Sequence, residues 1–489
     1  MVKSVVSACL AAVEIDKKLK IPIYRQLEKQ LRQIILNGTL VSKQKLPSTR
    51  DFALEMGVSR TTVKTVYEQL VAEGYLETKT GAGTFVSNGL ISQKLSIDKF
   101  HNAASFRRIQ HFSKIAEKIN GSKASIRFGS TQAFRPGVPA LDKFPTKAWN
   151  KYIASAMSQK NLSYGDLLGS IKLRNSVASH LADTRGMQVD AKQIVITSGA
   201  QQAFVLIAMI LLDAQDIVWY ENPGHIAGRD IMSMIGAKIV PIPIDEKGLD
   251  LETAVASFPQ PKLIFTTPSH QQPLGITMSL RRRLGLLKYA ADCGAWIIED
   301  DYDSEFRYRG RPLPALSALD KNGQVLYVGT FSKSLCSALR IGYVVIPSCL
   351  VDTFGKMRNL LGQSSSPITE EALANFIIDG RFSEHIRKMR RLYRDRRDML
   401  LKCLLEYCHE SLEPQLSDAG MHIIADLRRG IDDWQAHLAL LNAGIDSLPL
   451  SVYCSDPIKR SALVLGFSGV PQKAMPKSAK KLGEKLLRL

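Results

Sequence analysis

Residues 46–76 read LPSTRDFALEMGVSRTTVKTVYEQLVAEGYL, and this stretch decides the fold of the first part of the chain. Ser48 is placed to cap a short helix, with an acidic residue, Asp51, three positions later. Gly57 marks a turn, after which Ser59 is placed to cap a second helix. The apolar residues that this second helix would bury recur at helical spacing, at Val63, Val66 and Leu70. Two helices joined by a tight turn that contains glycine predict a helix-turn-helix.

Elements on both sides of this stretch complete a small domain. Upstream, a helix that stops at Gly38 is predicted by apolar residues at helical spacing, namely Ile23, Leu27, Leu31, Ile34 and Ile35. Downstream, Tyr75–Thr78 and Thr84–Ser87 flank the turn TGAG, in which Gly81 and Gly83 allow positive φ. This pattern predicts a β-hairpin wing.

The first quarter of the chain is strongly basic. The 489 residues carry a formal net charge of +19, and residues 1–125 hold 20 of the 65 Lys and Arg but only 10 of the 46 Asp and Glu. Such an excess indicates a polyanionic partner, nucleic acid first, or a solvated basic face. Arg60, Thr61 and Lys64 lie near the start of the predicted second helix, the end that a recognition helix inserts into the major groove. Side chains of these types can contact bases or phosphates there.

The motif closely resembles the GntR-type winged helix, whose sequence reads LPSxRxLAxxxGVSRxTV and ends in GxGTFV. Here residues 46–63 read LPSTRDFALEMGVSRTTV and residues 81–86 read GAGTFV. The resemblance implies that double-stranded DNA is a partner. The DNA-binding residues that it implies are Arg50, Ser59, Arg60, Thr61, Lys64 and Gly83.

The composition excludes several classes of protein. Hydrophobic residues make up 45% and charged residues 23%, which is typical of a soluble globular protein, and the length predicts two or three domains. The seven cysteines are scattered and form no CxxC pair, so we expect neither a disulfide framework nor a metal site. No apolar run is long enough to cross a bilayer, and the first residues are too weakly apolar for a signal peptide. We therefore expect a cytoplasmic protein.

The chain divides into three regions. Residues 1–87 form the predicted DNA-binding domain, and residues 88–125 read as a basic, polar linker with a possible short helix around Phe106–Ile119. Residues 126–489 alternate strand-like and helical runs, which predicts a large α/β domain. The strand-like runs are largely apolar, as strands covered on both faces should be, and comprise Gln193–Thr197, Asp216–Tyr220, Lys238–Ile242, Lys262–Thr266, Trp296–Glu299, Val325–Val328 and Tyr343–Ile346.

Candidate groups for binding pyridoxal phosphate (PLP) follow several of these runs. Binding this cofactor requires an amine that forms a Schiff base, a carboxylate at the pyridine nitrogen, and N–H groups with a cation for the phosphate. The turn Ser198-Gly199-Ala200-Gln201 follows the run that ends at Thr197 and opens a helix. The backbone N–H groups at that helix start would form a phosphate site.

The carboxylate and the amine follow later runs. Asp300 comes after Trp296–Glu299 and would face the ring nitrogen, and Tyr302 would face the ring hydroxyl. Lys333, in Thr330-Phe331-Ser332-Lys333, sits just past a strand end, where α/β sheets bind ligands. Arg340 lies seven residues later and can pair with phosphate. The order of phosphate turn, carboxylate, Ser-x-Lys and Arg predicts a PLP site.

The second region resembles a fold-type-I aminotransferase, and nearly the whole chain resembles the MocR subfamily of GntR regulators. The stretches that carry the resemblance are FRPGVPALDKFP, YGDLLGSIKLR, TSGAQQA, ENPGH, TPSHQQPLG, EDDYDSEFRY and GTFSKSLCSALRIGY. The resemblance implies Lys333 as the Schiff-base lysine, Asp300 at N1 and Tyr302 at O3′. It also implies a head-to-tail homodimer in which Tyr164 reaches the partner's phosphate. The other cofactor-binding residues that it implies are Gly199, Ala200, Gln201, Thr330, Ser332 and Arg340.

Three positions depart from the aminotransferase pattern. The ring-stacking position, usually Tyr, is His225, and the position usually held by Asn before a proline is Gln272. Aminotransferases that grip an α-carboxylate place an Arg where this chain has Val464, and without a bidentate guanidinium a substrate carboxylate loses its main anchor. Arg460 and Arg229 are candidate substitutes.

These observations favour a transcription regulator, not an enzyme, that senses PLP or a small amine or amino acid. The missing arginine favours PLP itself, with target genes in vitamin B6 or amino-acid metabolism. The alternatives are an active aminotransferase that carries a DNA-binding domain, and an architectural DNA binder whose second domain is only a dimerisation scaffold.

Overall fold

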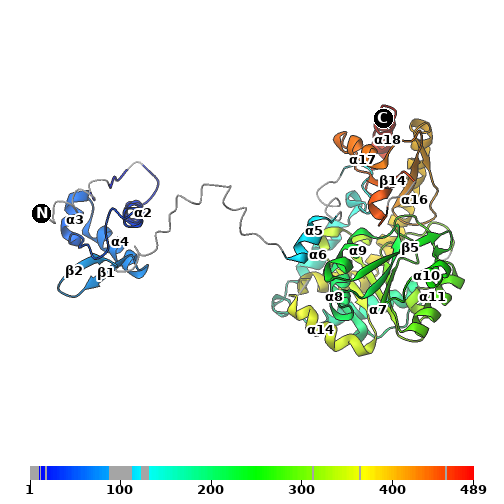
Figure 1. The fold of residues 1–489 in the computed structure, drawn as a ribbon, viewed down its shortest axis with the longest axis horizontal. Helices are drawn as coiled ribbons and strands as arrows, with labels where there is room; N and C mark the ends of the chain where they lie inside the picture. Colours follow the sequence, from blue (N-terminus) through cyan, green and yellow to red (C-terminus); the bar gives the residue numbers. More distant parts are fainter. Residues whose placement is uncertain are drawn as a thin grey trace. The chain divides into compact units, whose positions relative to one another are not determined.

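The computed structural model describes residue 10 and residues 13–16, 19–87, 113–122, 132–310, 313–362, 365–456 and 460–489. Contacts divide the chain into two compact units, Met1–His111 and Phe112–Leu489 (Figure 1). The boundary between the units falls inside the linker that the sequence predicts.

A helix-turn-helix lies in the first unit, as predicted. Its described helices are α2 (Ile23–Leu36), α3 (Thr49–Met56) and α4 (Arg60–Ala72). The Ser48 hydroxyl accepts a hydrogen bond from the backbone N–H of Asp51 at 3.2 Å, and Ser59 accepts one from Thr62 at 3.0 Å. Gly57 ends α3 with a φ of +62°. Both predicted caps and the predicted turn are therefore present.

A hairpin follows α4 and forms the predicted wing. Strand β1 (Leu76–Lys79) pairs antiparallel with β2 (Gly83–Val86). Gly81 and Gly83 have φ values of +75° and +112°, which side chains with a Cβ rarely adopt. The strands thus begin and end within a residue or two of the predicted limits.

An eight-stranded sheet forms the centre of the second unit. The strand order is β3-β10-β9-β8-β7-β4-β5-β6. All seven predicted strand runs lie in this sheet, and the observed strands are β3 (Ile194–Thr197), β4 (Ile217–Asn222), β5 (Lys238–Asp245), β6 (Gly248–Leu249), β7 (Leu263–Thr266), β8 (Trp296–Asp301), β9 (Val325–Thr330) and β10 (Gly342–Val345).

Two strands of this sheet run against their neighbours: the short edge strand β6, which is antiparallel to β5, and the interior strand β10. Strand β10 is antiparallel to both β3 and β9, whereas β9, β8, β7, β4 and β5 are parallel to one another. In its register, Gly342 at the start of β10 pairs with Thr197 and with Thr330, the last residues of β3 and β9. The chain just before β10 therefore reaches the same sheet edge as the carboxyl ends of β3, β8 and β9.

Helices cover both faces of the sheet (Figure 1). Ile194 and Ile196 pack in one apolar cluster with α7, whereas Val195 between them packs in another with α8. This alternation explains why the strands are apolar throughout. The helices of this part are α6 (Thr146–Ala156), α7 (Ile171–Arg185), α8 (Ala200–Leu211), α9 (Ile226–Ile235), α10 (Leu251–Ser257), α11 (Leu280–Cys293), α12 (Leu316–Leu319), α13 (Phe331–Ser334), α14 (Val351–Leu360) and α15 (Pro367–Ile378).

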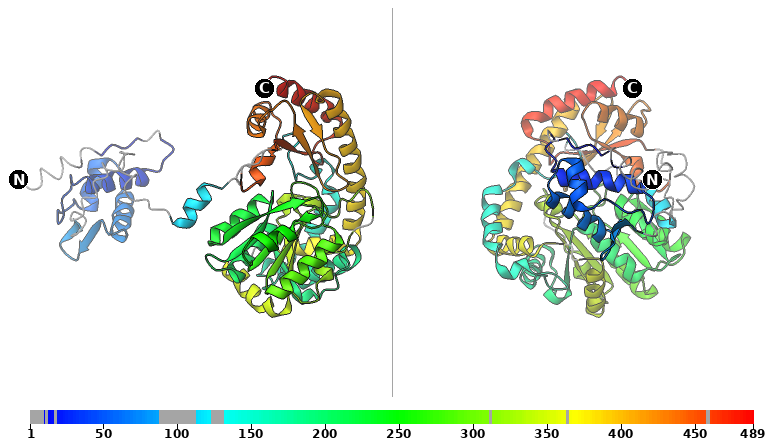
Figure 2. Two further views of the ribbon diagram at one scale, coloured as in Figure 1. Left: turned by 45° about the vertical axis from the view of Figure 1, so that its right-hand side comes forward. Right: turned by 90° about the vertical axis from the view of Figure 1, so that its left-hand side faces the viewer.

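A smaller antiparallel sheet lies in the C-terminal part of the second unit. Its order is β11-β12-β14-β13, with the strands β11 (Leu412–Pro414), β12 (His422–Leu427), β14 (Ala462–Gly466) and β13 (Leu448–Pro449). The 27-residue helix α16 (Arg381–Tyr407) runs beside both sheets (Figure 2). Helix α17 (Asp433–Asn442) packs against the smaller sheet, and α18 (Met475–Leu486) packs against α16 and α17.

The predicted linker helix is described only in part, as α5 (Lys114–Asn120), because residues 101–112 lie outside the described residues. This helix packs on α9. Nζ of Lys118 donates to the carbonyl oxygen of Ser233 at 2.9 Å, and the Ser122 hydroxyl donates to Asp230 at 2.5 Å. In the part of the chain that the structure describes, no helix has the length and apolar character to cross a bilayer.

Candidate cofactor pocket and DNA-reading surface

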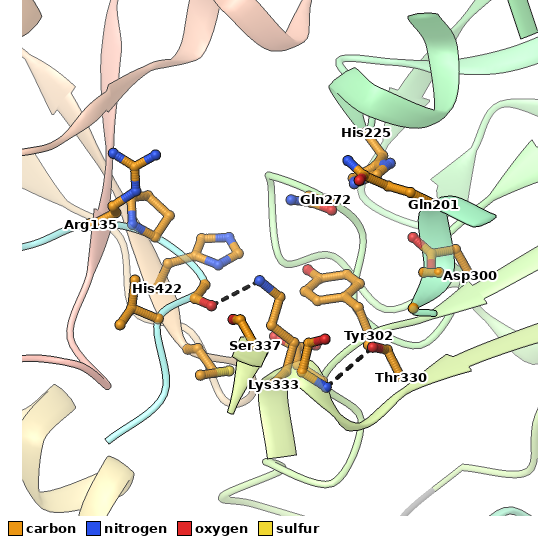
Figure 3. Close-up of a pocket in the computed structure, with 18 of the residues that line it drawn as sticks. Arg135, Gln201, His225, Gln272, Asp300, Tyr302, Thr330, Lys333, Ser337 and His422 are labelled. Carbon is orange, nitrogen blue, oxygen red and sulfur yellow. Dashed lines mark hydrogen bonds between the residues drawn. The ribbon is translucent and has the colours of Figure 1, made fainter. Parts of the chain in front are cut away.

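A cavity of about 230 Å³ opens at the sheet edge where β3, β8 and β9 end and the chain enters β10. Its walls bring together eleven of the twelve residues that the sequence predicts to bind PLP (Figure 3). These are Gly199, Ala200, Gln201, His225, Gln272, Asp300, Tyr302, Thr330, Ser332, Lys333 and Arg340. The twelfth, Tyr164, is 91% exposed and does not line the cavity.

The predicted phosphate groups lie together at one end of the cavity. Gly199 precedes α8 with a φ of +110°, and it lines the cavity together with Ala200 and Gln201, the first two residues of the helix. A Cβ on Gly199 would lie 3.9 Å from Nη1 of Arg340, which places that guanidinium beside the turn. The Thr330 hydroxyl accepts from the N–H of Ser332 at 3.2 Å and turns the chain out of β9. Backbone N–H groups and a guanidinium are the partners that a phosphate requires.

Asp300 is 3% exposed at the end of β8. Burial raises its pKa well above the usual range, and the nearby carboxylates of Asp301 and Glu221 raise it further. The positive charge of Lys333 lowers the pKa of Asp300 and so opposes these effects. A protonated pyridine nitrogen beside Asp300 would supply the positive charge that stabilises the ionised carboxylate. The chemistry of this wall therefore fits PLP.

Lys333 extends into the cavity from the short helix α13 that follows β9 (Figure 3). Its Nζ donates a hydrogen bond to the carbonyl oxygen of Gly137 at 2.8 Å. The amine thus lies between the wall that carries Asp300 and the segment that carries Gly137.

His225 and Gln272 line the cavity at the positions that depart from the aminotransferase pattern. Nδ1 of His225 accepts from the N–H of Gly228 at 3.0 Å, so the histidine caps α9. Its ring is parallel to that of Phe265, with an interplanar angle of 4° and centroids 6.3 Å apart. Both contacts fix the ring, and an imidazole held in this way can cover a cofactor ring. The backbone N–H of Gln272 donates to Thr267 at 3.0 Å.

A histidine that sequence reasoning missed lies behind Tyr302. Nδ1 of His270 is 2.9 Å from the Tyr302 hydroxyl and 3.1 Å from Oδ1 of Asp303, and all three residues are buried. His270 belongs to the stretch TPSHQQPLG, but no spacing rule connects it to a tyrosine 32 positions later. His422, whose pKa burial lowers to about 4, lines the cavity nearby.

The structure also shows what occupies the position of the missing arginine. Val464 is fully buried in β14, where it pairs with Ile424 and Leu448. Neither candidate substitute lines the cavity: Arg460 pairs with Asp426, and Arg229 donates to the carbonyl oxygens of residues 452 and 453. A different guanidinium, that of Arg135, does line the cavity, and sequence reasoning missed it.

All six predicted DNA-binding residues are exposed on the first unit, namely Arg50, Ser59, Arg60, Thr61, Lys64 and Gly83. The last of these lies in the wing, and four lie at or near the start of α4. Nε of Arg60 is 3.4 Å from the Thr49 hydroxyl, and Nζ of Lys64 is 3.6 Å from Glu68 one turn later. Exposed contacts of this kind leave both cations accessible to a polyanion.

Elsewhere in the described residues, no three His, Cys, Asp or Glu side chains gather as ligands for a metal ion. The cysteines described, from Cys293 to Cys454, are free thiols.

Comparisons with known proteins identify families for both units. Residues 23–86 match the family described as Bacterial regulatory proteins, gntR family. Residues 137–456 match the family Aminotransferase class I and II. The two matches correspond to the winged helix and to the part of the chain that surrounds the cavity.

Relatives match this chain across both units. The chain is 36% identical to the probable rhizopine catabolism regulatory protein MocR of Rhizobium meliloti, over 97% of this chain and 96% of that protein. It is 31% identical to the pyridoxine biosynthesis transcriptional regulator PdxR of Corynebacterium glutamicum, over 90% and 91%. The structure of Pyrococcus horikoshii kynurenine aminotransferase in complex with PMP superposes with a TM-score of 0.67 and 26% identity, over 80% of this chain and 98% of that one.

Proposed function

Because this chain belongs to the MocR-type GntR regulators, which join a winged helix to a PLP-binding aminotransferase-like domain, we propose that it senses a small effector in its PLP pocket and thereby alters transcription. The effector is PLP itself or a small amine or amino acid. An effector that binds two states of the protein with different affinity shifts the population between them, and the DNA-binding units respond to that shift.

The cavity supplies a residue for each part of the cofactor. In this proposal Lys333 forms the Schiff base, Asp300 holds the ring nitrogen and Tyr302 the ring hydroxyl. The phosphate is held by Arg340 and by the backbone N–H groups of the Gly199 turn and the first residues of α8. When bound, PLP supplies an aldehyde that reacts with primary amines and a ring that withdraws electrons from them. The observation that carries the proposal is this convergence in a chain that also has a winged helix.

In the first unit, α4 reads the major groove and the wing contacts the backbone. At the start of α4, the side chains of Arg60, Thr61 and Lys64 reach base edges or phosphates. Arg50 and Gly83 contact the DNA strand beside the groove. The exposure of these side chains supports the assignment.

The second unit acts as a sensor and at most retains residual transaminase half-reactions. The buried Val464 in place of an arginine removes the usual anchor of an α-carboxylate. The relatives that span the chain are named as regulators, which supports this assignment. The name of the Corynebacterium relative makes vitamin B6 metabolism a candidate target, and the name of the Rhizobium relative makes small-molecule catabolism another.

We further propose a cytoplasmic, head-to-tail homodimer. A DNA-binding regulator works in the compartment that holds the chromosome. The exposed ring of Tyr164 is available to reach the phosphate site of a second copy. Substituting Tyr164→Ala should then weaken PLP binding without unfolding the chain.

Borohydride reduction tests the cofactor site. The purified protein is incubated with PLP, reduced, digested and analysed by mass spectrometry, with Lys333→Ala as the test variant. Lys356→Ala is the control because Lys356 is an exposed lysine paired with Asp352 on α14. We expect a pyridoxyl adduct on the Lys333 peptide in the wild type and the control only. An adduct on other lysines, or on none, contradicts the sensor and favours the scaffold alternative.

Two further assays separate regulator from enzyme. DNA protection on the region upstream of the protein's own gene should change when PLP is added to the wild type but not to Lys333→Ala. Incubation with amino acids and keto acids should give no sustained turnover. Robust multiple turnovers that Lys333→Ala abolishes would instead establish the active aminotransferase.

A further inference from the structure

We propose that Arg135 binds the anionic group of the effector, so that the pocket selects small primary amines that also carry a carboxylate. This inference rests on the proposed function, since it names the class of ligand for the same pocket. It reverses the preference for PLP alone that the absence of an arginine at position 464 suggests.

Arg135 lies where such an anion would be. It lines the cavity, and Figure 3 shows it on the wall across from Asp300 and His225, with Lys333 between the two walls. The amine of Lys333 donates to the carbonyl oxygen of Gly137, two residues after Arg135. Two residues of chain span at most about 7 Å, so the backbone of Arg135 lies close to that of Gly137. The guanidinium is therefore carried by the segment that faces the amine of Lys333. A ligand whose amine takes the place of Lys333 would present a nearby carboxylate to this segment.

The segment that carries Arg135 lies against the strand that lacks the usual arginine. Val464 and Gly466 share one face of β14 because they are two residues apart in a strand. The N–H of Gly466 donates to the carbonyl oxygen of Phe134 at 2.7 Å, and a Cβ on Gly466 would lie only 2.1 Å from the carbonyl oxygen of Arg135. The absence of a side chain at Gly466 thus lets Arg135 come close to position 464. A neighbouring segment supplies the guanidinium that β14 does not.

A buried acid fixes the guanidinium in place. Nη1 of Arg135 forms an ion pair and hydrogen bond with Asp446, and the two side chains are 8% and 2% exposed. The backbone N–H of Asp446 also donates to the carbonyl oxygen of Ala133 at 2.9 Å. Because guanidinium carries five N–H donors in a rigid plane, pairing at Nη1 orients it and is compatible with a second, ligand carboxylate.

The other cations that line the cavity have different positions. Arg340 lies beside the Gly199 turn, where it would hold the cofactor phosphate, and Lys333 is the reacting amine. Among the described cations that line the cavity, Arg135 is therefore the one whose position suits an effector carboxylate.

Paired probes test this assignment in the PLP-loaded full chain. Each pair differs only by a carboxylate: glycine and methylamine, β-alanine and ethylamine, 4-aminobutyrate and propylamine. Titration is followed by the visible absorbance of the bound cofactor. We expect at least one acid to act at a concentration about 10-fold or more below that of its amine, as charge-assisted hydrogen bonds allow. No preference within any pair overturns the proposal.

Variants then locate the preference. Arg135→Met should abolish it while the response to the plain amine remains, and Arg460→Met is the control because that exposed arginine lies outside the cavity. A preference that survives Arg135→Met overturns the proposal. If the Arg135→Met variant does not bind PLP, the Arg135→Lys variant is tested instead, because lysine keeps the charge but lacks the planar guanidinium. A preference for the acids that is unchanged in Arg135→Lys also overturns the proposal. A wild-type chain without the borohydride adduct would overturn both proposals, whereas an adduct without preference overturns only this one.

Discussion

Nδ1 of His270 lies 2.9 Å from the hydroxyl oxygen of Tyr302. The same nitrogen is 3.1 Å from Oδ1 of Asp303, and since a carboxylate only accepts hydrogen bonds, this nitrogen carries the hydrogen. The Tyr302 oxygen then accepts from His270, and its own hydrogen is directed elsewhere. Because Tyr302 also lines the cavity, its hydroxyl can donate to the O3′ oxygen of a bound cofactor.

We therefore expect His270→Leu to raise the pH midpoint of the visible absorbance of bound PLP. Without His270 the Tyr302 hydroxyl can turn away, and a deprotonated O3′ loses a donor that stabilises it. Absorbance titration of the loaded protein measures the midpoint. Tyr302→Phe should shift it in the same direction, and His409→Leu on the surface should not. A midpoint that His270→Leu leaves unchanged would assign His270 a packing role only.

Replacing Asp300 should weaken the hold on the cofactor. In Asp300→Asn the ring nitrogen loses a buried charged partner, which stabilises a complex by about 2 kcal/mol, equivalent to roughly 30-fold in affinity. Equilibrium dialysis with PLP measures the change. Asp352→Asn is the control, because Asp352 forms an exposed pair with Lys356. Equal affinities for both variants would exclude Asp300 from the ring site.

Acid should destabilise the second unit through His422. Burial lowers the pKa of this side chain to about 4 in the folded chain, below its usual 6.5. Between these values the unfolded chain binds a proton that the folded chain does not, so stability falls as the pH drops from 6.5 towards 4, by up to about 3 kcal/mol.

Unfolding measured by tryptophan fluorescence tests this pH dependence, because all four tryptophans lie in the second unit, at positions 149, 219, 296 and 434. His422→Gln should show a smaller loss of stability between pH 7 and pH 4.5 than the wild type. His409→Gln, at an exposed histidine, should behave as the wild type. Identical pH profiles for wild type and His422→Gln would contradict the assignment.

Removing Arg60 should weaken DNA binding. We expect Arg60→Ala to lose about 10-fold in affinity for the protected upstream fragment, as the loss of a charged contact predicts. If Arg60 contacts a phosphate, the log–log salt slope should also fall by about 0.9. Gel shift at several salt concentrations measures both. Lys29→Ala removes an exposed positive charge from α2, outside the predicted DNA-binding residues, and should have little effect. Equal losses of affinity in both variants would indicate a non-specific effect of charge.

The sequence predicts those features that depend on neighbours along the chain. Ser48 and Ser59 bond to N–H groups three residues away, so their caps can be read locally. Lys333 and Asp300 were predictable because each follows an apolar strand, and parallel strands bring their carboxyl ends to one edge.

Features that depend on distant parts of the chain could not be predicted in this way. Strand β10 is as apolar as its neighbours, and periodicity does not reveal that it runs antiparallel. Arg135 and Asp446 are 311 positions apart, and each by itself reads as an ordinary surface charge. Their burial together depends on how the N-terminal segment of the second unit lies against the smaller sheet.

The contact between Gly466 and the Arg135 backbone limits how this protein can be rebuilt. A chimera that takes its last strand from a relative with any side chain at position 466 would force a methyl group or more into the carbonyl oxygen of residue 135. Such a chimera would displace Arg135 from its position in the cavity wall, even though no residue that lines the cavity had been changed. Swapping the two segments as one cassette avoids that collision.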